Sequence, residues 1–191
     1  VMSGNDWNSS FGQIPLVNCV PQTSQTVHLG SNGAGAFYYW YQPGYGTIDF
    51  LGNAFISSNA TCCVTGAYYL TEVINNVGGV LLSNLPLEAL SPAIDKLQNV
   101  YYIMGGAVYE LPFLGTVYAK APVLYGKYLN PVGISTDFAG NLYVADSSAG
   151  AIYEIPTEGT KGLNLADQFV VSSGLNVNVA AAVNARGDMY Y

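Results

Sequence analysis

Basic residues are scarce in this chain. Lysine and arginine together total 5 of 191 residues, against 12 aspartates and glutamates, so the net charge at pH 7 is −7. A nucleic-acid surface needs clustered cations that displace phosphate counterions, and an anionic membrane surface would repel the chain for the same reason. The composition therefore excludes nucleic acid as a partner, while the acidity favours solubility or cation binding.

Charged residues of either sign are also few. They make up 9% of the chain, whereas apolar residues make up 50%. A helical bundle needs long runs of Ala, Glu, Lys and Leu with a heptad-like period, and a disordered chain is charge-rich and poor in aromatics. This chain instead holds 16 Tyr, 7 Phe, 22 Gly and 9 Pro. Glycine and proline spread in this way predict many short strands joined by turns.

Long hydrophobic runs are almost missing. The stretch that could pass for a membrane span by its length is residues 100–119, whose single charge is Glu110. Gly105 and Gly106 lie in its middle, Pro112 follows, and its tyrosines recur at strand-like spacing. The stretch is therefore predicted to form two adjacent buried strands, and no membrane insertion is expected.

Histidine and cysteine, which supply many metal sites and nucleophiles, are rare as well. His28 is the only histidine, and it lies in a segment that is predicted to be an outer or linking strand, away from any second histidine. The three cysteines show no zinc spacing. If the chain is exported, Cys19 can form a disulfide with either Cys62 or Cys63, which leaves one free thiol.

A unit of strands and turns recurs along the chain. Residues 131–146 read PVGISTDFAGNLYVAD and residues 43–58 read PGYGTIDFLGNAFISS. Their equivalent aspartates are Asp137 and Asp49, and a third copy begins its turn at Asp95, so the turns are 46 and 42 residues apart. Strand repeats of about this length are typical of β-propellers. One sheet cannot bury both of its faces, whereas sheets stacked radially cover one another.

The repeat predicts an all-β fold, namely a β-propeller segment of about four four-stranded blades that is open and truncated at both ends. In the clearest copy the strands are expected at about 132–137, 141–146, 151–156 and 168–173. The expected units are a partial or degenerate first blade at 1–42, blades at 43–88, 89–130 and 131–177, and the start of a truncated blade at 178–191.

The repeated polar residues are interpreted as turn residues. The carboxylate of Asp137 can accept hydrogen bonds from backbone N–H groups of the turn, Gly140 supplies a positive φ, and Asn141 tolerates one. The same structural role is predicted in the other copies for Asp49, Gly52, Asn53, Asp95 and Asn99.

The sequence DFAGNLYVADSSAGAIYEIP resembles an NHL repeat. That repeat usually has a Pro-x-Gly-hydrophobic start, an Asp-x-x-Gly-Asn turn, a Tyr-Val-Ala-Asp strand and a closing hydrophobic strand that ends near proline. The matching residues are Pro131, Gly133, Asp137, Gly140, Asn141, Tyr143, Val144, Ala145 and Asp146. The other copies are degenerate, and the middle one has Gln98 where the turn glycine is expected. The resemblance implies a β-propeller, commonly of six blades.

The candidate binding residues lie on the rim formed by the loops between second and third strands. In the blade at 43–88 this loop is predicted to run from Ser57 to Gly66, longer than its counterparts, and longer loops often carry function. The residues predicted for this rim are Asn59, Thr61, Cys62, Cys63, Asp146, Ser147 and Ser148.

The function predicted from the sequence is that of an NHL-type binding or scaffold module for a protein or glycan partner. Few lysines, a composition rich in Gly, Ser, Tyr and Asn, and the disulfide option favour an extracellular or periplasmic location. No catalytic residue and no cofactor is predicted in this segment. The alternative is part of a propeller lyase or lactonase, and the resemblance then implies a divalent metal such as Ca²⁺ in the central channel.

Overall fold

The computed structural model describes residues 10–13, 16–17, 20–21, 25–28, 41–49, 51–60, 67–74, 77–175, 182–183 and 188–191. These residues form β-strands, turns and two short 3₁₀ helices, η1 (Gly159–Lys161) and η2 (Leu165–Asp167). Within the described ranges, no helix has the length and apolar character that a membrane crossing requires.

Three four-stranded antiparallel sheets make up most of the structure, and in each of them the strands follow one another in chain order. Sheet I consists of β5 (Tyr41–Ile48), β6 (Ala54–Ala60), β7 (Ala67–Ile74) and β8 (Val77–Leu85). Sheet II consists of β9 (Leu90–Ile94), β10 (Val100–Met104), β11 (Ala107–Leu111) and β12 (Val123–Lys127). Sheet III consists of β13 (Pro131–Thr136), β14 (Leu142–Asp146), β15 (Ala151–Ile155) and β16 (Phe169–Ser173).

Three smaller pairs complete the described strands, and all of them are antiparallel. They are β1 (Ser10–Gln13) with β4 (Gln25–His28), β2 (Leu16–Val17) with β3 (Val20–Pro21), and β17 (Ala182–Val183) with β18 (Met189–Tyr190). His28, the histidine considered above, is thus the last residue of β4 and pairs with Ser10.

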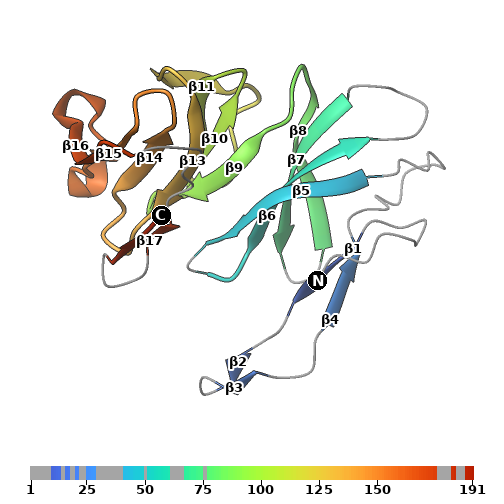
Figure 1. Ribbon diagram of the computed structural model, residues 1–191. Helices are drawn as coiled ribbons and strands as arrows, with labels where there is room; N and C mark the ends of the chain where they lie inside the picture. The colour runs from blue at the N-terminus through green and yellow to red at the C-terminus, as the bar shows by residue number, and fades with distance from the viewer. Residues whose placement is uncertain are drawn as a thin grey trace.

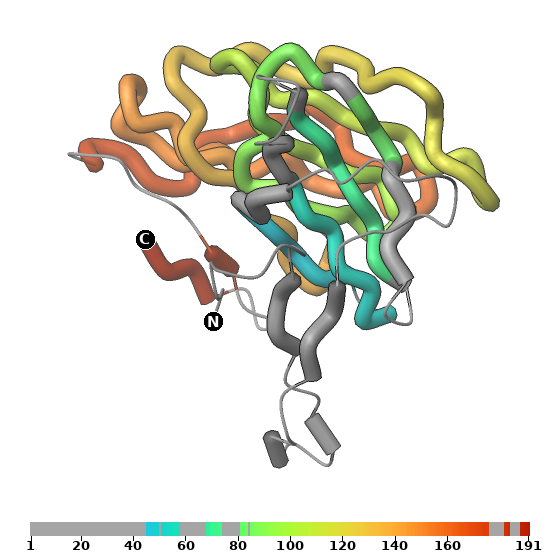
Figure 2. The backbone as a smooth tube through the Cα atoms, turned by 90° about the vertical axis from the view of Figure 1, so that its right-hand side faces the viewer, coloured from blue at the N-terminus to red at the C-terminus, as the bar shows by residue number. Residues whose placement is uncertain are grey.

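The three sheets lie side by side in the order I, II, III (Figure 1). Their first strands are in contact in succession, β5 with β9 and β9 with β13. Figure 2 looks from the side of sheet I, whose strands lie in front of the other two sheets. Sheets that repeat one plan and stack around their first strands define a β-propeller, so the predicted fold class is confirmed.

Apolar side chains fill the space between neighbouring sheets. One core joins sheets I and II and contains Phe55, Leu70 and Tyr102, each with no exposed surface. A second core joins sheets II and III and contains Leu142 and Val144, which are equally inaccessible. Each middle strand therefore contributes to two cores, because successive side chains of a strand point to opposite faces.

The strands of sheet III start and end within one or two residues of the predicted limits. The apolar stretch at 100–119 folds, as predicted, into two adjacent strands, β10 and β11, which pair antiparallel. The fourth strand of sheet II, β12, begins at Val123. The residues before it fold back on themselves, through a bridge between Phe113 and Tyr118.

The second strand of sheet I is longer than predicted. β6 continues to Ala60 because Ser57–Ala60 pairs with Ala67–Leu70 of β7. Asn59 therefore has its backbone inside a strand, opposite Tyr68, rather than in the loop where the sequence placed it. The predicted rim residues Thr61, Cys62 and Cys63 and the proposed disulfide partner Cys19 lie outside the described residues.

Candidate functional site

The turns between first and second strands have the same geometry in all three sheets. In sheet II, one carboxylate oxygen of Asp95 accepts hydrogen bonds from the backbone N–H groups of Leu97 and Asn99, both at 2.9 Å. The other oxygen accepts a bond from the Asn99 side chain at 2.9 Å. Asp49 accepts the corresponding three bonds in sheet I. In sheet III, Asp137 accepts the same two bonds from Asn141 and takes its third from the N–H of Gly140, three residues along the turn.

The residue before each turn asparagine has a positive φ. Gly52 and Gly140 adopt φ angles of 87° and 95°, where a residue without a Cβ meets little steric penalty. In sheet II the same position is Gln98, with a φ of 70°. A non-glycine residue adopts this conformation at a cost, which the hydrogen bonds accepted by the Asp95 carboxylate help to offset.

The turn asparagines also tie the turn to a second loop of the same sheet. The side-chain oxygen of Asn99 accepts a hydrogen bond from the backbone N–H of Phe113 at 2.9 Å. Asn141 accepts the equivalent bond from Thr157, also at 2.9 Å. The first turn and the loop after the third strand therefore lie at the same end of each of these sheets.

A tyrosine and two carboxyl groups meet beside the turn in sheets II and III. In sheet II, the hydroxyl of Tyr101 donates to Asp95 at 3.1 Å, and Tyr101 lies opposite Glu110 of β11. In sheet III, Tyr143 donates to Asp137 at 3.1 Å and lies opposite Glu154 of β15. We call these sets the Asp–Tyr–Glu clusters (Asp95, Tyr101 and Glu110; Asp137, Tyr143 and Glu154).

Burial governs the electrostatics of the clusters. It raises the pKa of Glu110, the negative charge of Asp95 raises it further, and a hydrogen bond with Tyr101 lowers it in part. Burial likewise raises the pKa of Asp95, although its hydrogen bonds with Asn99 and Tyr101 act in the opposite direction. Burial also raises the pKa of Glu154. Asp95, Glu110 and Glu154 therefore hold their protons at a higher pH than ordinary carboxyl groups do.

Sheet I departs from this pattern. Phe55 takes the place of the tyrosine and lies opposite Glu72, whose pKa is raised by burial and by the charge of Asp49. The ring of Tyr118, from the loop of sheet II, packs edge-on against Phe55 with centroids 6.1 Å apart. Its hydroxyl is buried and finds no hydrogen-bond partner among the described residues.

The predicted rim at the other end of the sheets has a different construction. Asp146 is 3% exposed, and its carboxylate accepts hydrogen bonds of 2.6 to 3.1 Å from the backbone N–H groups of Leu129, Asn130, Ser148 and Ala149. This carboxylate therefore fixes the turn after β14 to the link between sheets II and III. Ser147 joins the same link through its bond with the Asn130 side chain at 2.7 Å.

Asp146, Ser147 and Ser148 thus lie together on one turn, and Ser148 is exposed. Binding of a ligand at this turn stays a prediction. Among the residues that the structure describes, no three His, Cys, Asp or Glu side chains come together in a group suited to a metal ion. The described residues by themselves therefore do not fit the divalent metal centre that a propeller lactonase or lyase would require.

The Asp–Tyr–Glu clusters were not predicted as a site. The sequence does carry a signal for them, because a glutamate recurs in the third strand of each sheet, at Glu72, Glu110 and Glu154. Strand register decides that each glutamate lies opposite the aromatic residue of the second strand. In sheets II and III, that pairing brings the glutamate beside the same tyrosine that bonds with the turn aspartate.

No protein-family model and no curated protein sequence matches the chain. Solved structures do resemble it. A luciferin-regenerating enzyme superposes with a TM-score of 0.59 at 17% identity, over 92% of this chain and 60% of that one. A gluconolactonase from Xanthomonas campestris gives 0.58 at 9% identity, over 85% and 57%. Virginiamycin B lyase from Staphylococcus aureus gives 0.54 at 12% identity, over 92% and 53%.

The chain therefore spans 53% to 60% of the length of these three structures. Identities this low establish the common fold and nothing finer. The chain is a segment of a β-propeller of the kind that these enzymes share.

Replacing Tyr101 and its neighbour Tyr102 by phenylalanine is expected to have opposite effects. Tyr101 and Tyr102 are 1% and 0% exposed, but the first donates to Asp95 and the second has a buried hydroxyl without a partner in the described structure. Tyr101→Phe should lower the free energy of unfolding by about 1.5–3 kcal/mol, because a buried carboxylate loses a donor.

Tyr102→Phe removes a buried hydroxyl that makes no bond, so its free energy of unfolding should be unchanged or up to about 1 kcal/mol higher. Urea unfolding of both variants measures the difference. Equal losses in the two variants would contradict the assignment of the Tyr101 hydroxyl to the cluster.

The raised carboxyl pKa values predict that stability falls as the pH increases. A carboxyl group with a raised pKa binds its proton more tightly in the folded chain, so its stabilising contribution is complete below the ordinary value, 4.5 for Glu110, and disappears above the raised one. Urea unfolding from about pH 5 to about pH 7.5 should therefore show a declining free energy of unfolding.

The matched variant is Glu110→Gln, which keeps the shape of the side chain without its titration. The decline should be shallower in this variant, and its stability near neutral pH should be at least that of the wild type. A free energy of unfolding that rises over this range, or a slope that Glu110→Gln leaves unchanged, would contradict the prediction.

Proposed function

We propose that this chain forms the scaffold of several blades in a propeller enzyme of the lactonase or lyase kind. The observation that supports the proposal is the superposition of 85% to 92% of the chain on a gluconolactonase, a luciferin-regenerating enzyme and a virginiamycin B lyase. The chain accounts for a little over half of each of those proteins. The remainder of the ring then supplies the metal ligands that the described residues lack.

Within this proposal, the described carboxylates of the chain hold its loops in place and take no part in the chemical step. The carboxylates of the turn aspartates and of Asp146 accept hydrogen bonds from backbone N–H groups. A carboxylate that accepts several such bonds is well placed to hold loops and poorly placed to bind a substrate or metal. In the Asp–Tyr–Glu clusters, Glu110 and Glu154 lie opposite the tyrosines of the second strands and bond with their hydroxyl groups.

The test is made on the complete ring that contains this chain. Hydrolysis of glucono-1,5-lactone is measured with and without a metal chelator, and melting is followed during addition of Ca²⁺. The proposal expects lactone turnover that the chelator abolishes and Ca²⁺ restores, together with a rise in melting temperature on metal binding. The proposal would be contradicted by a ring that hydrolyses no lactone, cleaves no cyclic ester by elimination and shows no change in melting temperature when metal is added.

The second candidate is an NHL-type binding or scaffold module outside the cytoplasm, with a protein or glycan partner at the rim of Asp146, Ser147 and Ser148. The NHL-like sequence of sheet III and the described carboxylates, which serve structural roles, favour it. This reading includes an exported chain with a disulfide between Cys19 and either Cys62 or Cys63.

Export makes a chemical prediction that needs no ligand. Chain isolated from its native compartment without reductant should contain one disulfide and one free thiol, because a bridge that uses Cys19 leaves one of the neighbouring cysteines unpaired. Peptide mass spectrometry after blocking free thiols identifies the pair. Three blocked thiols would contradict an oxidising location.

A further inference from the structure

Exposed apolar side chains gather at one end of the three sheets. We call this end the turn rim; it comprises the turns at 49–53, 95–99 and 137–141 and the loops at 112–122 and 156–168. Turn tips and loops usually carry polar residues that water can solvate. Here six large apolar side chains are 37% to 71% exposed, namely Leu51, Leu97, Leu114, Val117, Phe138 and Leu165.

Contacts between sheets II and III join the turn at 95–99 to the turn and the loop of sheet III. The aliphatic part of Lys96 lies against Gly140, where a Cβ would be 3.1 Å from it, and its ammonium group lies 5.4 Å from the centre of the Phe138 ring. A methyl carbon of Leu97 lies against Gly162 in the same way, at 3.3 Å. The turn of sheet II therefore rests on both the turn and the loop of sheet III.

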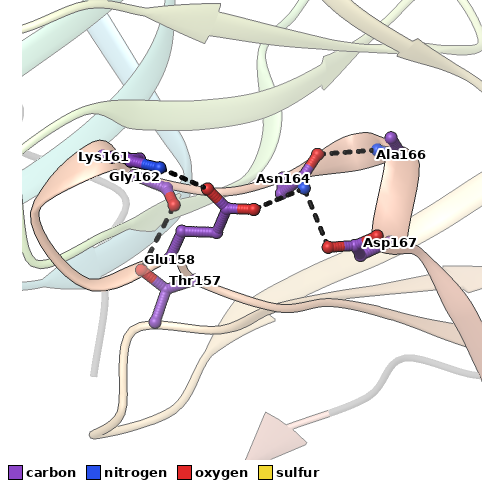
Figure 3. A network of polar contacts seen from close by, with 7 residues as sticks. All are labelled: Thr157, Glu158, Lys161, Gly162, Asn164, Ala166 and Asp167. Atoms are coloured by element: carbon purple, nitrogen blue, oxygen red, sulfur yellow. Dashed lines mark hydrogen bonds and ion pairs between the residues drawn. The ribbon is translucent and has the colours of Figure 1, made fainter.

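The loops that carry the other apolar tips are held by their own hydrogen bonds. In the loop of sheet II, the N–H of Leu114 donates to the carbonyl of Val117 at 2.8 Å, which presents both side chains at the tip of a tight hairpin. In the loop of sheet III, the side chain of Asn164 donates to Glu158 at 2.7 Å and to Asp167 at 2.8 Å (Figure 3). These bonds fix η2, where Leu165 is exposed. Apolar tips that are already ordered lose little entropy when they bind.

The turn rim exposes three lysines and two acids, Glu158 and Asp167, although the chain as a whole is acidic. Three of the five basic residues lie on it, Lys96, Lys120 and Lys161, and all three are exposed. Its exposed acids are engaged, since Glu158 pairs with Lys161 at 3.6 Å and Asp167 bonds with Asn164. Lys96 and Lys120 therefore present their charge beside apolar side chains.

We propose that the turn rim is a docking surface for a protein segment whose apolar side chains are flanked by carboxylates. Such a segment would bury the apolar tips and place its acidic groups near Lys96 and Lys120, which is the complementarity that selects partners and orients them. A second copy of the chain fits less well, because the two rims would bring lysines against lysines. An anionic membrane is also a poor partner, because the net charge of the chain is −7 and the membrane surface would repel it.

The experiment uses the full chain and two synthetic peptides that differ only in charge. In one, leucines and phenylalanines alternate with aspartates and glutamates; in the other, lysines replace the acids. Fluorescence anisotropy should show that the acidic peptide binds more tightly and that salt weakens its binding. The triple variant Leu51→Ser, Leu114→Ser and Phe138→Ser should weaken it by about tenfold or more.

Two further variants distinguish peptide binding at the turn rim from nonspecific hydrophobic binding elsewhere on the chain. Lys96→Glu with Lys120→Glu should weaken binding of the acidic peptide to a similar degree, and this variant carries the test if the triple variant does not fold. Leu129→Ser should change nothing, because Leu129 is 76% exposed at the other end of the sheets. Melting curves establish that each variant is folded.

Several results would overturn the proposal. They are binding of neither peptide, equal or tighter binding of the lysine peptide, and an affinity that neither rim variant changes. Co-sedimentation with phosphatidylglycerol vesicles would assign the surface to membranes instead. A dimer that the triple variant abolishes in analytical ultracentrifugation would assign it to a second copy.

Discussion

Burial of both faces of each sheet against its neighbours is the constraint on which the rest of this structure depends. Tyr101 and Tyr102 are adjacent in β10 and belong to different cores, the first between sheets II and III and the second between sheets I and II. A strand that is apolar on both faces is stable only when a sheet covers each side, since burial of apolar surface supplies most of the folding free energy. The same requirement brings the first strands of successive sheets together and sets every turn of one kind at the same end of the molecule.

That radial packing explains why the turn aspartates and the glutamates beside them have structural roles. The turn aspartates satisfy backbone N–H groups of the turn that would otherwise lack a partner, and in all three sheets the aspartate also bonds with the side chain of the turn asparagine. The glutamates of the third strands are half-buried because an aromatic residue of the second strand lies opposite each of them. The raised pKa values of Asp95, Glu110 and Glu154 therefore follow from the stacking of the sheets. In other proteins such shifts can mark catalysis, but here the geometry that causes them repeats from sheet to sheet, as structural features do.

The two ends of the sheets differ in chemistry, and this difference bears on function. At the end with Asp146 the turn is polar and its carboxylate is fully occupied, with Ser147 and Ser148 beside it. At the turn rim, apolar tips and lysines face solvent. A propeller ring can therefore act on a small ligand near its channel and contact a macromolecule on one end, so the scaffold role proposed for this chain and the docking surface inferred on it are compatible.

The sequence by itself determined the repeating unit, the order and approximate limits of the strands, and the turns that begin at Asp49, Asp95 and Asp137. These depend on neighbours within a few residues and on the alternation of apolar side chains, which a sequence displays directly. Only the tertiary structure decided that Tyr101 joins Asp95 to Glu110, that Tyr118 covers Phe55 of the preceding sheet, and that Lys96 and Leu97 rest on the turn and loop of the next. Strand register and the stacking of sheets bring those partners together, and residues far apart in the sequence carry no local pattern that would reveal such contacts.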